Sequence, residues 1–310
     1  MEKKRIEFID LAKGFCILLV VAHHVSTDYA VCQVGTLFRM PLYYFLSGLF
    51  FKTYGSFADF TIKKINRLII PMVFFYAIGK ALGHLNVPYW FLLSLFEVNI
   101  MSYWLIKIAK DKTWLVTTLF FAVGAVGYTL GRIDIKVPLY IGPSLTCAPF
   151  FIVGYLLRKK TSVLYPNNFD KYWILTFIAC IAVVVVTFMT NGDMVSIITN
   201  RIPYNIVAFY VAALCGIMGV LTIAKRIGHM PYISYIGRYS IILLGTHFLV
   251  TVLIREHVEN YFGKGTLAND VVLFLLCVAI CSILIPVLTK LLPWFTAQKD
   301  LIKWPLKKKD

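Results

Sequence analysis

The sequence has few acidic residues and no long polar stretch. It contains 15 Asp and Glu against 31 Lys and Arg, and only 15% of its 310 residues are charged, whereas 59% are hydrophobic. A water-soluble domain with so much apolar surface could not cover it with polar side chains. The apolar runs recur from residue 15 to residue 295, and no break between them is long enough for a separate soluble domain. We therefore predict one membrane domain over residues 1–310.

Cysteine pairs with the spacing of a zinc or redox site are also absent. The seven cysteines are scattered, almost all inside apolar runs, and no CxxC pair occurs. They are interpreted as small buried hydrophobic residues, and we expect no metal. The net charge of +16 does not indicate a nucleic-acid partner, because the basic residues lie in short clusters between apolar runs.

The apolar runs predict an all-α integral membrane protein of about ten transmembrane helices. A spanning helix needs about 20 mostly apolar residues. The predicted spans are 14–34, 36–52, 68–86, 88–107, 113–131, 137–157, 172–190, 203–224, 239–256 and 268–292. The first run lacks a small-residue cleavage site and carries His23, His24 and Asp28, so we interpret it as a retained helix and not a signal peptide.

The distribution of basic residues predicts the orientation. Assigning the loops alternately to two sides places 24 of the 31 basic residues on the side that holds both termini, and six on the other. Lys and Arg accumulate in cytoplasmic loops of membrane proteins. Both termini are therefore predicted to be cytoplasmic.

Ionisable residues in the first predicted helix are candidates for function. Asp10, Lys13, His24 and Asp28 lie near one helical face, and a helix that enters the membrane at Lys13 places His24 about 15 Å deep. Ionisable groups inside lipid are costly and tend to be functional. Burial favours a neutral imidazole, which can accept a proton. The alternative, a polar stripe that only hydrogen-bonds neighbouring helices, is less favoured for this aligned set.

A second candidate is the basic cluster of Lys63, Lys64 and Arg67 in the predicted cytoplasmic loop. Such a cluster can anchor the chain at anionic lipid, and the residues alone favour this interpretation. It can also bind the phosphates of a nucleotide-like cofactor.

Together these segments resemble the acyltransferase-3 membrane family, specifically its single-domain, fucose O-acetyltransferase-like branch of sugar O-acetyltransferases. The similarity runs over most of the chain. It is carried by residues 5–14 (RIEFIDLAKG), by the pair Lys13 and His24, and by residues 40–48 (MPLYYFLSG). Residues 63–71, the WFL element at 90–92, and Gly237, Ser240 and His247 complete it. Many relatives carry Arg at the position of Lys13, and many carry a further extracytoplasmic domain that this chain does not show.

The resemblance implies a membrane O-acyltransferase of the bacterial cytoplasmic membrane that moves an acetyl group from acetyl-CoA to a sugar hydroxyl of a lipid-linked or surface polysaccharide. His24 is then the expected general base, assisted by Lys13, Asp10 and Asp28, while Lys63, Lys64 and Arg67 hold the donor phosphates. The candidate substrate-binding residues are Arg39, Ser47, Trp90, Glu97 and His247. Expected partners are the acyl-CoA, the glycan acceptor, membrane lipid and polysaccharide-assembly proteins.

The main alternative is a proton-coupled transporter or flippase of a polar small molecule or glycolipid, since intramembrane charge also suits transport. Transporters often show two matching halves, but here the polar residues concentrate in the first 100 positions, which favours an enzyme. A purely structural or lipid-binding protein is the other alternative, and it would not need buried ionisable residues.

Overall fold

The structure is a computed structural model that describes residues 6–26, 30–83, 89–110, 112–158, 173–191, 195–202 and 205–303. Within these ranges the regular structure is helical, apart from an isolated β-bridge between Ser196 and Arg201. The helices are α1 (Glu7–Val25), α2 (Ala30–Gly35), α3 (Pro41–Leu49), α4 (Phe57–Lys64), η1 (Ile65–Ile69), α5 (Ile70–Ala81), α6 (Trp90–Ile108), α7 (Thr113–Arg132), η2 (Pro138–Tyr140), α8 (Ile141–Leu157), α10 (Trp173–Asn191), α11 (Ile206–Ile227), α12 (Pro231–Arg238), α13 (Ser240–Phe262) and α14 (Leu267–Leu291).

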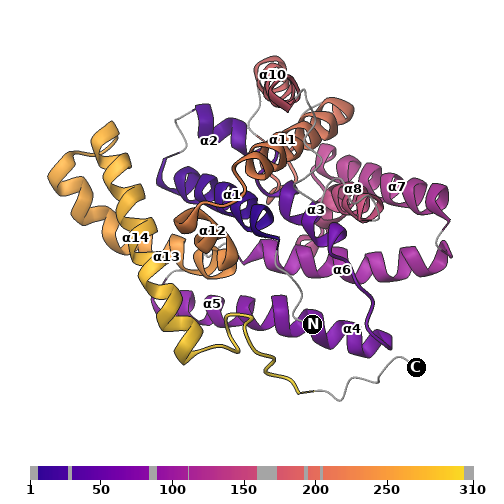
Figure 1. Ribbon diagram of the computed structural model, residues 1–310, viewed down its shortest axis with the longest axis horizontal. Helices are drawn as coiled ribbons and strands as arrows, with labels where there is room; N and C mark the ends of the chain where they lie inside the picture. The colour runs from indigo at the N-terminus through magenta and orange to yellow at the C-terminus, as the bar shows by residue number, and fades with distance from the viewer. Residues whose placement is uncertain are drawn as a thin grey trace.

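The described part of the chain contains eight helices that are long and apolar enough to cross a membrane. They are α1, α6, α7, α8 with η2, α10, α11, α13 and α14. In Figure 1, α10 and α14 lie at the edges of the bundle, where large apolar side chains are exposed along both helices and would face lipid. The predicted all-helical, multi-pass architecture is thus confirmed, whereas the count of ten spans is not.

The difference in number arises at the predicted spans 36–52 and 68–86. The first contains turns at 36–40 and then the short helix α3, which ends at Leu49 and is too short to cross a membrane. The second forms part of a continuous helical stretch, α4–η1–α5, from Phe57 to Ala81. A capping box between Ser56 and Asp59 starts this stretch. Its π-helical turn, η1, comes just before Pro71, which has no N–H to bond the carbonyl four residues earlier.

Helix α1 differs from the predicted span 14–34. It begins earlier, at Glu7, and ends at Val25, with Ser26 in extended backbone. The chain resumes as α2 at Ala30, and Asp28 lies outside the described residues.

Two helix crossings depend on glycine. A Cβ at Gly48 of α3 would lie 1.9 Å from the Phe151 carbonyl oxygen on α8, and one at Gly154 would lie 2.0 Å from the Phe45 carbonyl oxygen. The same reciprocal arrangement joins α1 to α12. A Cβ at Gly237 would lie 1.8 Å from the Asp10 carbonyl oxygen, and one at Gly14 would lie 2.3 Å from that of Ile233. Small residues let backbones approach this closely in membrane proteins.

Long-range contacts join loops that the alternating topology assigns to the same side. His229 Nδ1 lies 3.1 Å from Glu7 Oε2, so the start of α1 meets the segment before α12. Lys63 Nζ lies 2.7 Å from Asp300 on the segment after α14. On the opposite side, Asn200 Nδ2 donates to the Gly127 carbonyl of α7 at 2.8 Å. That the basic side is cytoplasmic stays a prediction.

Candidate active site

Two histidines from distant parts of the sequence meet where α1 ends against α13. The ring centroids of His24 and His247 are 5.0 Å apart. His247 is completely buried, and its Nδ1 donates to the Leu243 carbonyl at 2.7 Å, which leaves Nε2 as a proton acceptor. This Nε2 is buried and has no hydrogen-bond partner among the described residues. The pair therefore presents a basic nitrogen that the fold itself does not use.

The histidine pair lies well inside the bundle. His247 is seven residues from the start of α13, about 10 Å along its axis, and α13 continues for about 22 Å beyond it. Because His24 contacts His247 in the last turn of α1, that helix ends at this level and does not run on beside α13. The polar backbone of a helix end must find partners inside a membrane.

Arg255 supplies those partners and was not among the predicted site residues. Its Nη2 lies 2.9 Å from the His24 carbonyl oxygen and 3.2 Å from that of Val25, and it donates to both. A cation also compensates the negative end of the helix dipole. The sequence offered a weak signal, since Arg255 falls at the edge of the predicted span 239–256. The sequence could not indicate the contact of Arg255 with the carbonyls of His24 and Val25, because α1 was predicted to continue beyond Val25.

Arg39 is the buried cation of this region, 7% exposed. Its Nη1 donates to the carbonyls of Leu19 and Cys32, both at 3.3 Å. Its charge acts on His23, His24 and His247, so the structure brings two of the candidate substrate-binding residues, Arg39 and His247, together with His24. The His23 ring lies edge-on to that of His24, with centroids 5.8 Å apart.

Asp10 and Lys13 lie near the other end of α1. Lys13 Nζ is 3.5 Å from Asp10 Oδ1, and the buried Asp10 belongs to the crossing with Gly237. Lys13 precedes His24 by eleven residues, about 16 Å along the helix, so the two side chains sit on different levels. Tyr43 donates to the Lys13 carbonyl at 3.1 Å. The N-terminal motif and the motif at residues 40–48 thus meet at Tyr43.

Of the remaining candidate substrate-binding residues, Trp90 and Glu97 are on α6, and Ser47 of α3 packs against that helix. Ser47 donates to Asn99 Oδ1 at 3.2 Å and accepts from Asn99 Nδ2 at 3.0 Å. Glu97 Oε2 accepts a hydrogen bond from the Ser144 hydroxyl of α8 at 2.6 Å. An ionisable residue inside an apolar span needs such a polar partner. Trp90 is 8% exposed and begins α6. Asn99 and Ser144 were missed, because serine and asparagine inside apolar runs are common in helix packing.

The basic cluster divides into two parts. Lys63 Nζ lies 2.7 Å from Asp300 Oδ2, and Arg67 Nη2 lies 3.4 Å from Asp300 Oδ1. Arg67 also donates to the Ala297 carbonyl. Asn66 holds the same C-terminal segment through the backbone of Leu301 and Ile302. In Figure 1 this yellow segment runs beside α4 and α5.

Lys64 points elsewhere. Its ammonium lies 5.9 Å from the centre of the Phe51 ring and 5.4 Å from that of Phe60, within the range of a cation–π contact. Burial lowers the pKa of Lys64 to about 8. The structure therefore brings together Lys63 and Arg67 and separates Lys64 from them.

Comparison with known proteins identifies the family. The acyltransferase-3 family model, described as an acyltransferase domain, matches residues 6–291. No curated protein and no solved structure matches the chain. The matched range runs from the start of α1 to the end of α14, and it includes every described candidate residue. The chain therefore belongs to the acyltransferase-3 family and is a multi-pass membrane acyltransferase.

Proposed function

We propose that this protein transfers an acetyl group from acetyl-CoA to a hydroxyl of a lipid-linked or surface glycan in the bacterial cytoplasmic membrane. The observation that supports this most is the histidine pair, His24 and His247, inside the bundle beside Arg39. A sugar hydroxyl is a weak nucleophile near neutral pH, and a positioned base typically accelerates its attack by roughly 10²–10⁴-fold.

The proposed reaction is a direct acyl transfer. His24 accepts the proton of the sugar hydroxyl while the hydroxyl oxygen attacks the thioester carbonyl carbon. The carbon–sulfur bond then breaks, and the CoA sulfur leaves as a thiol with the proton that His24 held. The free Nε2 of His247 suits a hydrogen bond from the acceptor sugar. We propose that Arg39 stabilises the negative charge that develops on the thioester oxygen, the kind of stabilisation that is often the largest single contribution.

Asp10 and Lys13 receive a narrower role than the sequence suggested. The pair lies in the first two turns of α1, where the Asp10 backbone packs against α12, about three turns from His24. We assign Lys13 to the donor as it passes along α1, and Asp10 to positioning Lys13. The proposed role of Asp28 is unchanged, since that residue lies outside the described part of the chain.

At the donor end, Lys63 and Arg67 are proposed to bind the CoA phosphates. Both now contact Asp300, which is one-third exposed, so the carboxylate occupies the position that a phosphate oxygen would take. Phosphate binds to such cations more strongly than a carboxylate because it carries more charge and more acceptor oxygens. Asp300 is therefore proposed to yield its cations to the donor.

Replacing Asp300 by Asn is expected to raise the affinity for acetyl-CoA by roughly two- to fivefold, because exposed ion pairs typically contribute about 0.2–1 kcal/mol. The backbone contacts of Asn66 keep the C-terminal segment in place. The measurement is the acetyl-CoA concentration that gives half-maximal transfer. Glu256→Gln removes the same charge from an exposed position on α13 and should leave that concentration unchanged. Unchanged or weaker donor affinity in Asp300→Asn would show that Asp300 does not compete with the donor.

The proposed activity is tested with purified protein in lipid and acetyl-CoA labelled in its acetyl group. Release of CoA together with label in a lipid-linked or surface glycan is the expected result. Glycan flux across vesicles without transfer of label would identify a flippase instead. Transfer of label to protein or phospholipid alone would keep the acyltransferase and remove the glycan as its acceptor.

A further inference from the structure

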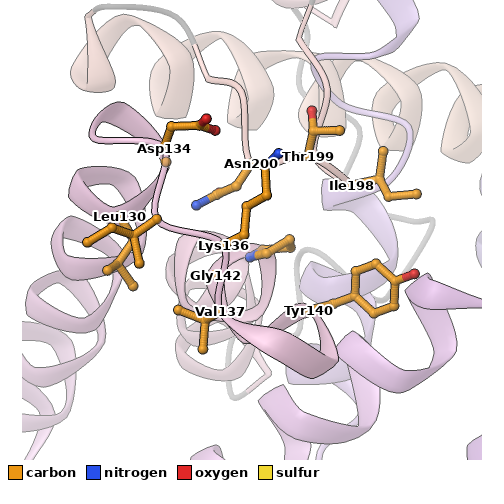
Figure 2. Close-up of a pocket in the computed structure, with 12 residues that line it drawn as sticks. Leu130, Asp134, Lys136, Val137, Tyr140, Gly142, Ile198, Thr199 and Asn200 are labelled. Atoms are coloured by element: carbon orange, nitrogen blue, oxygen red, sulfur yellow. The ribbon is translucent and has the colours of Figure 1, made fainter.

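A cavity lies away from the histidine pair, between the ends of α7 and α8 and the loop before α11. Its volume is about 330 Å³, the lower end of the range for small-molecule sites. The connection 133–140 forms one wall and the loop 198–200 forms the other. Figure 2 shows Lys136, Tyr140 and Asn200 around it. The alternating topology places both walls on the outer side, opposite Lys63 and Asp300.

The walls are held in a costly backbone conformation. Asp134, Leu139, Tyr140 and Asn200 have φ values of 53°, 60°, 62° and 55°, and they are four of the six non-glycine residues with positive φ in the described ranges. Non-glycine residues with positive φ are uncommon, and they cluster at active sites and ligand-binding sites. Three of the four line the cavity directly, and the fourth, Leu139, precedes Tyr140.

Asn200 shows how the strain is maintained. It is 7% exposed, accepts from the Thr146 hydroxyl at 2.8 Å and donates to the Gly127 carbonyl at 2.8 Å. Its own carbonyl oxygen lies 2.2 Å from where a Cβ of Gly131 would be. The loop is thereby fixed to both α7 and α8, and the cavity is preformed.

The lining selects an amphiphilic, polyhydroxylated ligand. Lys136 and Asp134 bring one charge of each sign, and Thr199 and Tyr140 add hydroxyls, so donors and acceptors are balanced. The Tyr140 ring offers an apolar face next to its hydroxyl, as the C–H face of a sugar requires. Around these groups Ile135, Leu139 and Ile198 are exposed. A polar cavity with an apolar rim at a membrane surface fits a sugar that is attached to a lipid.

Tyr140 connects the cavity to residues on α6. Its ring centroid lies 6.2 Å from that of Trp90, and its carbonyl accepts from Ser144, whose hydroxyl also contacts Glu97. Two of the candidate substrate-binding residues, Trp90 and Glu97, are thus connected to the cavity through Tyr140.

We propose that this cavity binds the membrane-proximal sugar of a lipid-linked glycan and holds the acceptor while a hydroxyl reaches His24. The inference rests on the proposed function and narrows its acceptor from lipid-linked or surface glycan to the lipid-linked form. Because the cavity is separate from the reacting atoms, its residues affect acceptor affinity and not the rate at saturation.

The experiment measures equilibrium binding, and then acetyl transfer, with full-length protein in phosphatidylcholine nanodiscs. The probes are polyprenyl phosphates linked to glucose, galactose or mannose, with bare polyprenyl phosphate and phosphatidylethanolamine for comparison. At least one sugar-linked probe is expected to bind more tightly than both. Lys136→Ala should weaken that binding about tenfold, the typical loss of a hydrogen bond to a charged group. Lys264→Ala, which removes an exposed lysine from another predicted outer loop, should leave it unchanged.

The outcomes separate the two proposals. Tighter sugar-linked binding that Lys136→Ala weakens, without acetyl transfer to any probe, would support the cavity and contradict the proposed function. Equal binding of the bare polyprenyl phosphate or of phosphatidylethanolamine would identify a lipid site and overturn the inference. Acetyl transfer with the same acceptor KM in the wild type and Lys136→Ala would overturn it while leaving the proposed function intact.

Discussion

His24→Ala is expected to lower acetyl transfer by roughly 10²–10⁴-fold, the usual contribution of a general base. The imidazole of His24 is the group that α1 brings against His247, and alanine removes it without changing the backbone. Arg255 binds the carbonyl oxygens of residues 24 and 25 and not the ring, so the end of α1 keeps its partner in the variant. The loss should therefore appear in the rate while the protein remains folded.

The measurement combines the purified transfer rate with the acetyl content of surface glycan in intact cells at matched expression. His23→Ala is the control, since its ring contacts His24 edge-on but does not pair with His247. It should reduce transfer far less. Full activity in His24→Ala would remove His24 from the chemistry, and loss of activity in His23→Ala alone would assign the base to the neighbouring residue.

Gly237→Ala is expected to have the largest effect on stability. The added methyl group would lie 1.8 Å from the Asp10 carbonyl oxygen and 2.5 Å from the Gly14 backbone nitrogen, and neither backbone atom can rotate away. Helices α1 and α12 must then separate along a crossing that also holds Asp10 and Lys13. Overpacking typically costs about 1–3 kcal/mol, occasionally more, and contact with two backbone atoms places this change at or above that range.

Thermal unfolding in detergent measures this effect. Gly219→Ala on α11 is the matched control, because its nearest neighbour would be the Cys180 Cβ at 3.6 Å, an ordinary contact. Alanine is also the better helix former, so Gly219→Ala should unfold at or slightly above the wild-type temperature. Equal unfolding temperatures for Gly237→Ala and the wild type would mean that α1 and α12 do not cross at these glycines.

The sequence was most informative where hydrophobicity and motif spacing act over short distances. All eight long helices fall on predicted spans, and Gly237, Ser47 and His247 were noticed as members of motifs. What their order in the chain could not show is that Gly237 packs on Asp10, or that His247 meets His24. Both are contacts between helices more than 200 residues apart, and hydropathy carries no information about which helices are neighbours.

The end of α1 was the feature that hydropathy misplaced. The apolar run continues past residue 25, and an unbroken span was the simplest reading. The break is tolerated because Arg255 donates hydrogen bonds to the carbonyl groups of His24 and Val25 at the end of α1. Arg255 is more than 200 residues away in the sequence, so hydropathy could not indicate this contact. Asp300 was overlooked for a similar reason. Nothing in the neighbouring sequence indicates a role for an isolated acidic residue after the last span. The role of Asp300 becomes apparent only from its contacts with Lys63 and Arg67.

The contact of Asp300 with Lys63 also sets an order of events during synthesis. Lys63 is translated early, whereas Asp300 follows α14, so the two can meet only after the last long helix has left the ribosome and entered the bilayer. Until then the cations beside α4 are available to anionic phospholipid, which can hold the incomplete chain at the membrane surface. This charge pair can therefore form only after α14 has been inserted.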